Sequence, residues 1–124
     1  MIRVILVMVG GSMGAACRYG VNLLSVRLAG SSFPWGTLFV NGAGCLLIGL
    51  FFGLSERLAW LTPSVRLFFV TGFLGALTTF SSFAVETVNT ANGGSLHLAL
   101  LNFFVNNAGG FLLVLLGMWA ARTI

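Results

Sequence analysis

The chain has 124 residues, of which 58% are hydrophobic and only 6% are charged, with a mean hydropathy of +1.06. Soluble domains carry about 25% charged residues, so the composition excludes an ordinary soluble domain. All six basic residues are arginines, and with two acidic residues they give a net charge of +4. The arginines are scattered singly, which argues against a nucleic-acid partner.

A helix needs roughly 20 apolar residues to cross the hydrocarbon core of a bilayer. The sequence therefore predicts an all-α membrane protein with one transmembrane domain, residues 1–124, and four spans at about 2–28, 36–55, 64–90 and 95–121. Glu56-Arg57 marks a predicted membrane interface after the second span. Thr62-Pro63 is typical of a helix N-cap followed by proline in the first turn.

Four spans place both termini on one side of the membrane, together with the loop between the second and third spans. That side carries four arginines against two on the other, which favours cytoplasmic termini by the positive-inside rule. The difference is small in a chain with so few charges, so it leaves the orientation open.

Three of the spans carry small or polar residues at helical spacing, so each presents them on one face. The first aligns Gly10, Gly14 and Arg18, and its two glycines permit close helix approach. The glycines are interpreted as packing residues, whereas an asparagine amide in hydrocarbon must find partners or water. The aligned asparagines therefore indicate a polar track, which comprises Thr37, Asn41, Cys45, Gly49 and Gly53 in the second span and Asn102, Asn106 and Gly110 in the fourth.

The third span holds the most informative stretch, GFLGALTTFSSF from Gly72 to Phe83. Hydroxyl side chains can bond to backbone carbonyls and distort a helix, and glycines add backbone freedom. We therefore expect this helix to be broken near the membrane midplane, where protein or a polar cavity must cover the backbone. Phe80 and Phe83 lie one turn apart inside this hydroxyl-rich run. The span's polar face is continuous and consists of Thr71, Gly75, Thr78, Ser82 and Glu86.

These motifs resemble the Fluc (CrcB) family of fluoride channels over essentially the whole chain. The residues that carry the resemblance are Gly10-Gly11-x-x-Gly14-x-x-x-Arg18, Gly36-Thr37-x-x-x-Asn41 and Gly72-Phe73-x-Gly75-x-x-Thr78-Thr79-Phe80-Ser81-x-Phe83-x-x-Glu86. The resemblance implies an antiparallel, dual-topology homodimer in the bacterial inner membrane, with two pores that pass fluoride. It also implies a structural sodium ion at the dimer centre, held by the backbone carbonyls of Gly75 and Thr78.

The resemblance places pore residues at Asn41, Phe80 and Phe83. Fluoride is small and strongly hydrated, so a pore must replace its water with other donors. Asn41 carries two amide N–H groups, hydroxyls come from Thr37, Thr79 and Ser82, and phenyl edges carry weakly positive C–H groups. Asn106 matches a further polar position of the family. The family often has serine where this chain has Gly110, which puts part of the usual polar track in doubt and leaves Asn106 and Asn107 to compensate.

The roles of two charged residues, Arg18 and Glu86, can each be interpreted in more than one way. Arg18 either attracts anions at a vestibule or extends its charged end to the membrane interface, and the sequence favours neither. Glu86 is expected to cap polar backbone or to lie at a dimer contact rather than to touch the anion. His97 is expected to be an interface residue.

Three other classes of function compete with the channel. An enzyme is not expected, because the sequence has no nucleophile–base pair and no set of metal ligands. A four-helix multidrug exporter of dual topology would need an ionisable carboxylate in its first span, which is absent here. A small assembly subunit of a larger membrane complex would have no reason for a polar distortion at the midplane.

Overall fold

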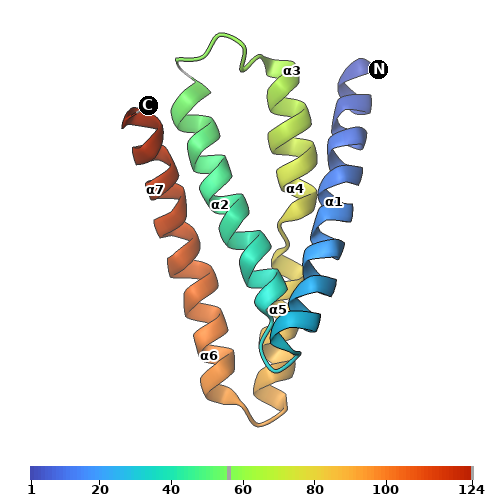
Figure 1. Cartoon of the computed structure of the whole chain (residues 1–124), viewed down its shortest axis with the longest axis vertical. Coiled ribbons are helices and arrows are strands. Elements are labelled where there is room, and N and C mark those ends of the chain that lie inside the picture. Colours follow the sequence, from blue (N-terminus) through green and yellow to red (C-terminus); the bar gives the residue numbers. More distant parts are fainter. Residues whose placement is uncertain (56, 124) are drawn as a thin grey trace.

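The computed structural model describes residues 1–55 and 57–123, so the predicted interface residue Glu56 lies outside the described residues. As predicted, the protein is all-helical, with four helices long and apolar enough to span a membrane: Ile2–Ala29, Trp35–Ser55, Pro63–Asn92 and Leu96–Thr123. They run side by side along the molecule, and both termini lie at the same end (Figure 1).

The first two spans are single α-helices, whereas the third and fourth contain π-helical segments. In chain order the elements are α1 (Ile2–Ala29), α2 (Trp35–Ser55), α3 (Pro63–Arg66), π-helical η1 (Leu67–Leu74), α4 (Gly75–Leu77), α5 (Phe80–Asn92), α6 (Leu96–Phe104), π-helical η2 (Val105–Gly109) and α7 (Gly110–Thr123). Glycines with positive φ end two of the spans, Gly30 after α1 and Gly94 after α5.

The start of the third span follows the predicted capping pattern. Pro63 opens α3, and the Thr62 side chain accepts a hydrogen bond from the backbone N–H of Val65 at 3.4 Å. Because the first N–H groups of a helix have no partner within it, this cap satisfies one of them.

Helix packing depends on glycines that let backbones approach. A Cβ atom on Gly10 or Gly14 of α1 would overlap the carbonyl oxygens of Phe68 and Phe73 in η1. The predicted close approach at Gly10 and Gly14 is therefore present, and its partner is the first half of the third span. A small core of Val40, Leu74 and Leu77 joins α2 to this same half.

Most large apolar side chains point outward, away from this core. Phe39, Phe80 and Phe111 are 66%, 76% and 74% exposed, respectively. Exposed apolar area on this scale is unfavourable in water and is expected where lipid or another protein covers the surface.

Candidate functional site

The site is built around Thr78 and Thr79, which lie between α4 and α5. Both have extended backbone, with φ and ψ of −80° and 154° for Thr78 and −152° and 115° for Thr79. Their hydroxyls satisfy nearby backbone: Thr78 Oγ1 donates to the Leu74 carbonyl at 3.0 Å, and Thr79 Oγ1 accepts from the N–H of Ser82 at 3.2 Å. Thr79 is thereby the N-cap of α5.

Asn41 of α2 holds the backbone of Thr79 on both sides. Its Oδ1 accepts from the Thr79 N–H at 2.8 Å, and its Nδ2 donates to the Thr79 carbonyl at 3.2 Å. One turn along α2, Gly44 leaves room for the methyl group of Thr78, which a Cβ atom at position 44 would overlap. Thr79 thus receives from α2 the acceptor that its N–H lacks within its own helix, and Thr78 receives space for its methyl group.

The same contacts redirect two N–H groups of the third span. In a continuous α-helix, the N–H of Thr79 would donate to the Gly75 carbonyl and that of Ser82 to the Thr78 carbonyl. Here the Thr79 N–H donates to Asn41 and the Ser82 N–H donates to Thr79 Oγ1. The carbonyls of Gly75 and Thr78 therefore lose their usual helical donors.

A row of side-chain amides connects Asn41 to the fourth span and back to α5. Asn41 Nδ2 donates to Asn106 Oδ1 at 3.1 Å, Asn106 Nδ2 to Asn102 Oδ1 at 2.8 Å, and Asn102 Nδ2 to Thr87 Oγ1 at 2.8 Å. Asn102 is only 1% exposed. Both hydrogens of the Asn41 amide have acceptors, so a fluoride ion at Asn41 would have to replace one of them.

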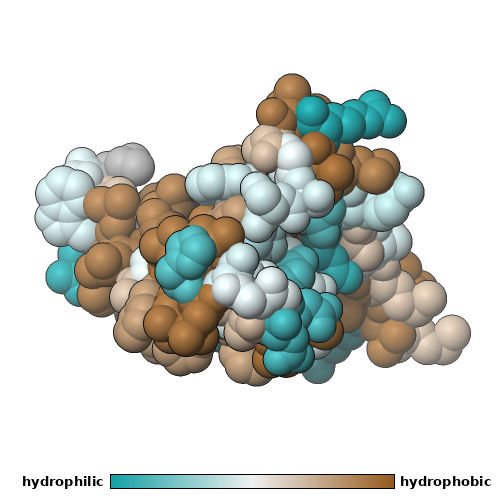
Figure 2. All heavy atoms as spheres, turned by 90° about the horizontal axis from the view of Figure 1, so that it is seen from below, coloured by the Kyte–Doolittle hydropathy of each residue, from teal (hydrophilic) through white to brown (hydrophobic). Residues whose placement is uncertain are grey.

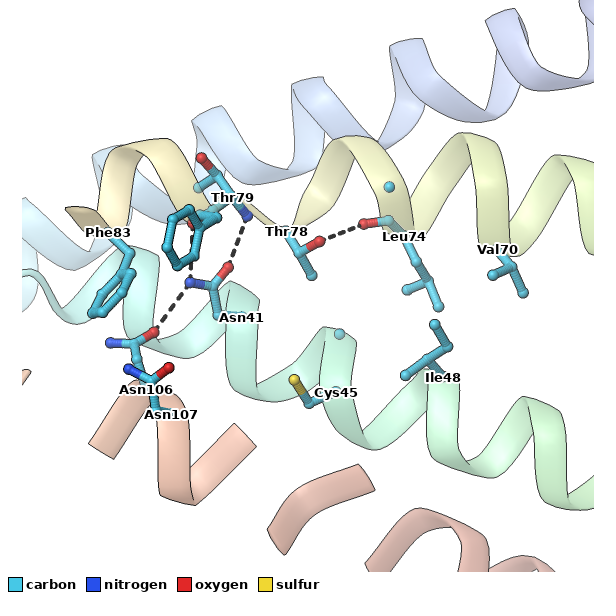
Figure 3. A pocket seen from close by; sticks show the side chains of 13 residues that line it. Asn41, Cys45, Ile48, Val70, Leu74, Thr78, Thr79, Phe83, Asn106 and Asn107 are labelled. Atoms are coloured by element: carbon cyan, nitrogen blue, oxygen red, sulfur yellow. Dashed lines mark hydrogen bonds between the residues drawn. The ribbon is translucent and has the colours of Figure 1, made fainter. Parts of the chain in front are cut away.

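Asn41 and Asn106 of this row line a cavity of about 330 Å³, the amide cavity, between the second, third and fourth spans (Figure 3). Phe80 and Phe83 lie on its wall with ring centroids 5.6 Å apart and ring planes inclined by 57°. Phe83 is buried at 5% exposure, whereas Phe80 is 76% exposed. The full lining is Asn41, Gly44, Cys45, Ile48, Val70, Leu74, Gly75, Thr78, Thr79, Phe80, Phe83, Asn106 and Asn107.

A second polar cavity, also about 330 Å³, lies where α1, the turn into α2 and α5 meet. Hydrophilic residues gather on this end of the molecule (Figure 2). Thr37 Oγ1 donates to Glu86 Oε1 at 2.8 Å there, so Glu86 is bonded to a side chain of α2 rather than to backbone N–H. Buried Asn22 Oδ1 and Glu86 Oε2 have no protein partner among the described residues, and the cavity has room for water that can donate to them.

The structure brings most of the predicted site residues together, but not all. The amide cavity is lined by seven of them: Asn41, Gly75, Thr78, Thr79, Phe80, Phe83 and Asn106. Thr37 lines the second cavity instead, Ser82 lies behind Thr79 and accepts its hydroxyl at 3.0 Å, and Arg18 lines neither cavity.

Sequence reasoning placed Asn102 on the polar track of the fourth span but did not name it as a pore residue, and it did not single out Thr87. Asn102 lies one turn before Asn106, so its helical spacing was a usable signal. Thr87 gave no such signal, because its partner Asn102 is 15 residues away in the sequence.

The chain is similar in sequence to known proteins over nearly its whole length. Residues 5–118 match the family described as CrcB-like protein, Camphor Resistance (CrcB). The chain is 42% identical over 115 residues to a protein of Azobacteroides pseudotrichonymphae, covering 93% of this chain and 92% of that one. It is 41% identical over 124 residues to one of Agrobacterium fabrum, covering 100% and 99%, and 36% identical over 120 residues to one of Clostridium perfringens, covering 97% and 94%.

All three relatives carry the name fluoride-specific ion channel FluC. These relatives are named as channels and not as enzymes. The four helices of this chain that are able to span a membrane agree with a multi-pass membrane protein. A family match over residues 5–118 and identities of 36–42% over nearly whole chains establish that this chain belongs to the CrcB family of fluoride-specific ion channels.

Proposed function

We propose that this protein is a fluoride-selective channel that passes fluoride passively out of the cytoplasm of a bacterial cell, across its inner membrane. The observation that carries the proposal is the amide cavity, in which Asn41, Asn106 and the Phe80–Phe83 pair meet. Family membership supports fluoride as the permeant ion, because the relatives are named as fluoride-specific channels.

The chemistry of the cavity suits a small, strongly hydrated anion. Amides and hydroxyls supply N–H and O–H donors, and phenyl edges carry a positive potential. Hydroxyls near this path come from Thr79 on the cavity wall, Ser82 behind it and Thr37 in the second cavity. Arg18 lines neither cavity, and its proposed role is to attract anions at a vestibule. A membrane potential negative inside drives an anion outward with about 2.3 kcal/mol per 100 mV, so an open pore lowers cytoplasmic fluoride and its toxicity with no further energy source.

The test uses liposomes that contain only this protein. Fluoride should leave them without a proton or sodium gradient, and chloride should leave far more slowly. A requirement for either gradient would contradict a channel and favour an exporter. The absence of any fluoride flux would leave the assembly-subunit interpretation standing.

We further propose that the channel is an antiparallel homodimer of dual topology. The amide cavity of one chain is walled by Phe80, which is 76% exposed, and Gly75 is exposed beside it. A partner that covers this surface would close the cavity and bury the extended backbone from lipid. Two copies fused through an additional spanning helix, which forces them antiparallel, should conduct, whereas a fusion that forces parallel copies should not; the opposite result would exclude this arrangement.

The structural sodium ion is proposed at the carbonyls of Gly75 and Thr78. Both carbonyls lose their helical donors to Asn41 and Thr79, and carbonyl oxygens are suitable ligands for a hard cation. A twofold axis through this segment would double the two carbonyls of one chain to four ligands. Thr78→Val keeps the carbonyl and removes the hydroxyl, so the central ion should persist in that variant; its loss with an unchanged fold would indicate a side-chain ligand.

A further inference from the structure

The donor groups of the amide cavity are nearly all committed to bonds within the protein. Asn41 Nδ2 donates to Thr79 and Asn106, and Asn106 Nδ2 donates to the carbonyl and Oδ1 of Asn102 at 3.2 and 2.8 Å. The hydroxyls of Thr78 and Thr79 donate to Leu74 O and Ser82 Oγ. An anion that entered this cavity would have to break one of these bonds before any of these groups could bind it.

Asn107 differs from these residues. Its Nδ2 donates to the Phe103 carbonyl at 2.7 Å, and among the described residues this is the one hydrogen bond that the amide makes. A side-chain amide has two hydrogens to donate, so one N–H of Asn107 stays available while the side chain lines the cavity.

Asn107 lies in the π-helical segment η2, Val105–Gly109, next to Asn106. Both side chains line the cavity (Figure 3). Single π-helical turns of this kind are frequent at functional sites.

From the free N–H of Asn107 and its place on the cavity wall, we infer that Asn107 contacts the anion in the pore. The inference rests on the proposed function. It assigns the free amide donor of the cavity to Asn107, whereas Asn106 organises the cavity through its bonds to Asn41 and Asn102. Gly110, where the family often has serine, has no side chain to donate and does not line this cavity, so Asn106 and Asn107 are the fourth-span residues on its wall.

The experiment compares fluoride flux through liposomes containing wild-type protein, Asn107→Leu, Asn107→Gln and Asn92→Leu. Asn107→Leu removes the donor, and the fluoride concentration that gives half-maximal flux should rise about tenfold to hundredfold, the range of a hydrogen bond to a charged group. Asn107→Gln keeps an amide and should recover most of the loss. Asn92→Leu makes the same chemical change at an exposed position and should match wild type.

Thermal unfolding of each variant separates a contact from a purely structural role. If Asn107 only satisfies the Phe103 carbonyl, Asn107→Leu will lower the Tm and the amount of folded protein but leave the half-maximal concentration unchanged, and the inference is wrong. The same holds if the wild type conducts and Asn107→Leu conducts identically. If the wild type passes no fluoride, the proposed function fails and this inference fails with it.

Discussion

Two of the contacts between the second and fourth spans differ in kind. Near Gly49 and Gly117 the two backbones meet directly: a Cβ atom on Gly49 would overlap the Val114 carbonyl, and one on Gly117 would overlap the Leu46 carbonyl. Farther along the same pair of spans, Asn41 and Asn106 meet through a side-chain hydrogen bond of 3.1 Å.

The two contacts have different capabilities. At the glycine contact no polar side chain intervenes, so it sets the distance between the helices and can do little else. At the asparagine contact each bond can be exchanged for a bond to water or to an anion. We infer that the stability of the fold depends mainly on the glycine contact, whereas the binding of an ion depends mainly on the asparagine contact.

The largest effect is expected from breaking the glycine contact. In Gly117→Leu the new side chain would meet backbone atoms of Leu46 and Leu50, which cannot move aside as a side chain can. The expected loss is about 3 kcal/mol or more, at the upper end of overpacking costs. Gly20→Leu is the matched control, because no atom lies within 4 Å of a Cβ there. Thermal unfolding in detergent would measure both, and a Gly117→Leu protein with a wild-type Tm would contradict the interpretation.

An intermediate effect is expected at the asparagine contact. Asn41→Leu leaves the buried N–H of Thr79 without its acceptor, at about 1–3 kcal/mol, and removes one donor to the Thr79 carbonyl. Relative to wild type, the fluoride flux should fall by a larger factor than the equilibrium constant for folding. Asn41→Asp keeps an acceptor for the Thr79 N–H but sets a carboxylate oxygen against the Thr79 carbonyl and Asn106 Oδ1, so at neutral pH it should destabilise the protein at least as much as Asn41→Leu does. Equal stability of all three proteins would show that Asn41 does not hold Thr79.

The smallest effect is expected at Gly44, which lies in α2 one turn after Asn41. Gly44→Ala brings a methyl group onto the methyl group of Thr78, at an expected cost of about 1 kcal/mol. Thr78→Ser removes the opposing methyl and keeps the hydroxyl, so the double variant should recover most of that loss. The free energies of unfolding of wild type, the two single variants and the double variant give the coupling between positions 44 and 78. If the two single effects simply add in the double variant, the residues are not in steric contact.

The sequence predicts the helices well because their signal is local. Apolar length identifies four spans, and each observed helix starts and ends within two residues of its predicted limits. The Thr62-Pro63 cap and the close approach at Gly10 and Gly14 also depend on short-range patterns. These features need no knowledge of what the helix later contacts.

The site is less predictable because its bonds join distant segments. Asn41 and Thr79 are 38 residues apart, and Thr37 and Glu86 are 49 apart. The polar stripes indicate that these residues face other helices, but not which atom each will bond. The same limit applies to η1 and η2, because a π-helical turn stays in place through packing that its own sequence does not reveal.

The hydrogen bonds between Asn41 and the Thr79 backbone have a consequence for how the chain is assembled in the membrane. The Thr79 N–H has no acceptor within its own helix, and the hydrocarbon interior has no water to replace the missing partner. Synthesis proceeds from the N-terminus, so α2 is made before the third span and carries Asn41 to the bilayer ahead of Thr79. The partner of the extended backbone is thus available when that backbone arrives, and reversing the order of the two spans would leave the third span to enter lipid with unpaired backbone groups.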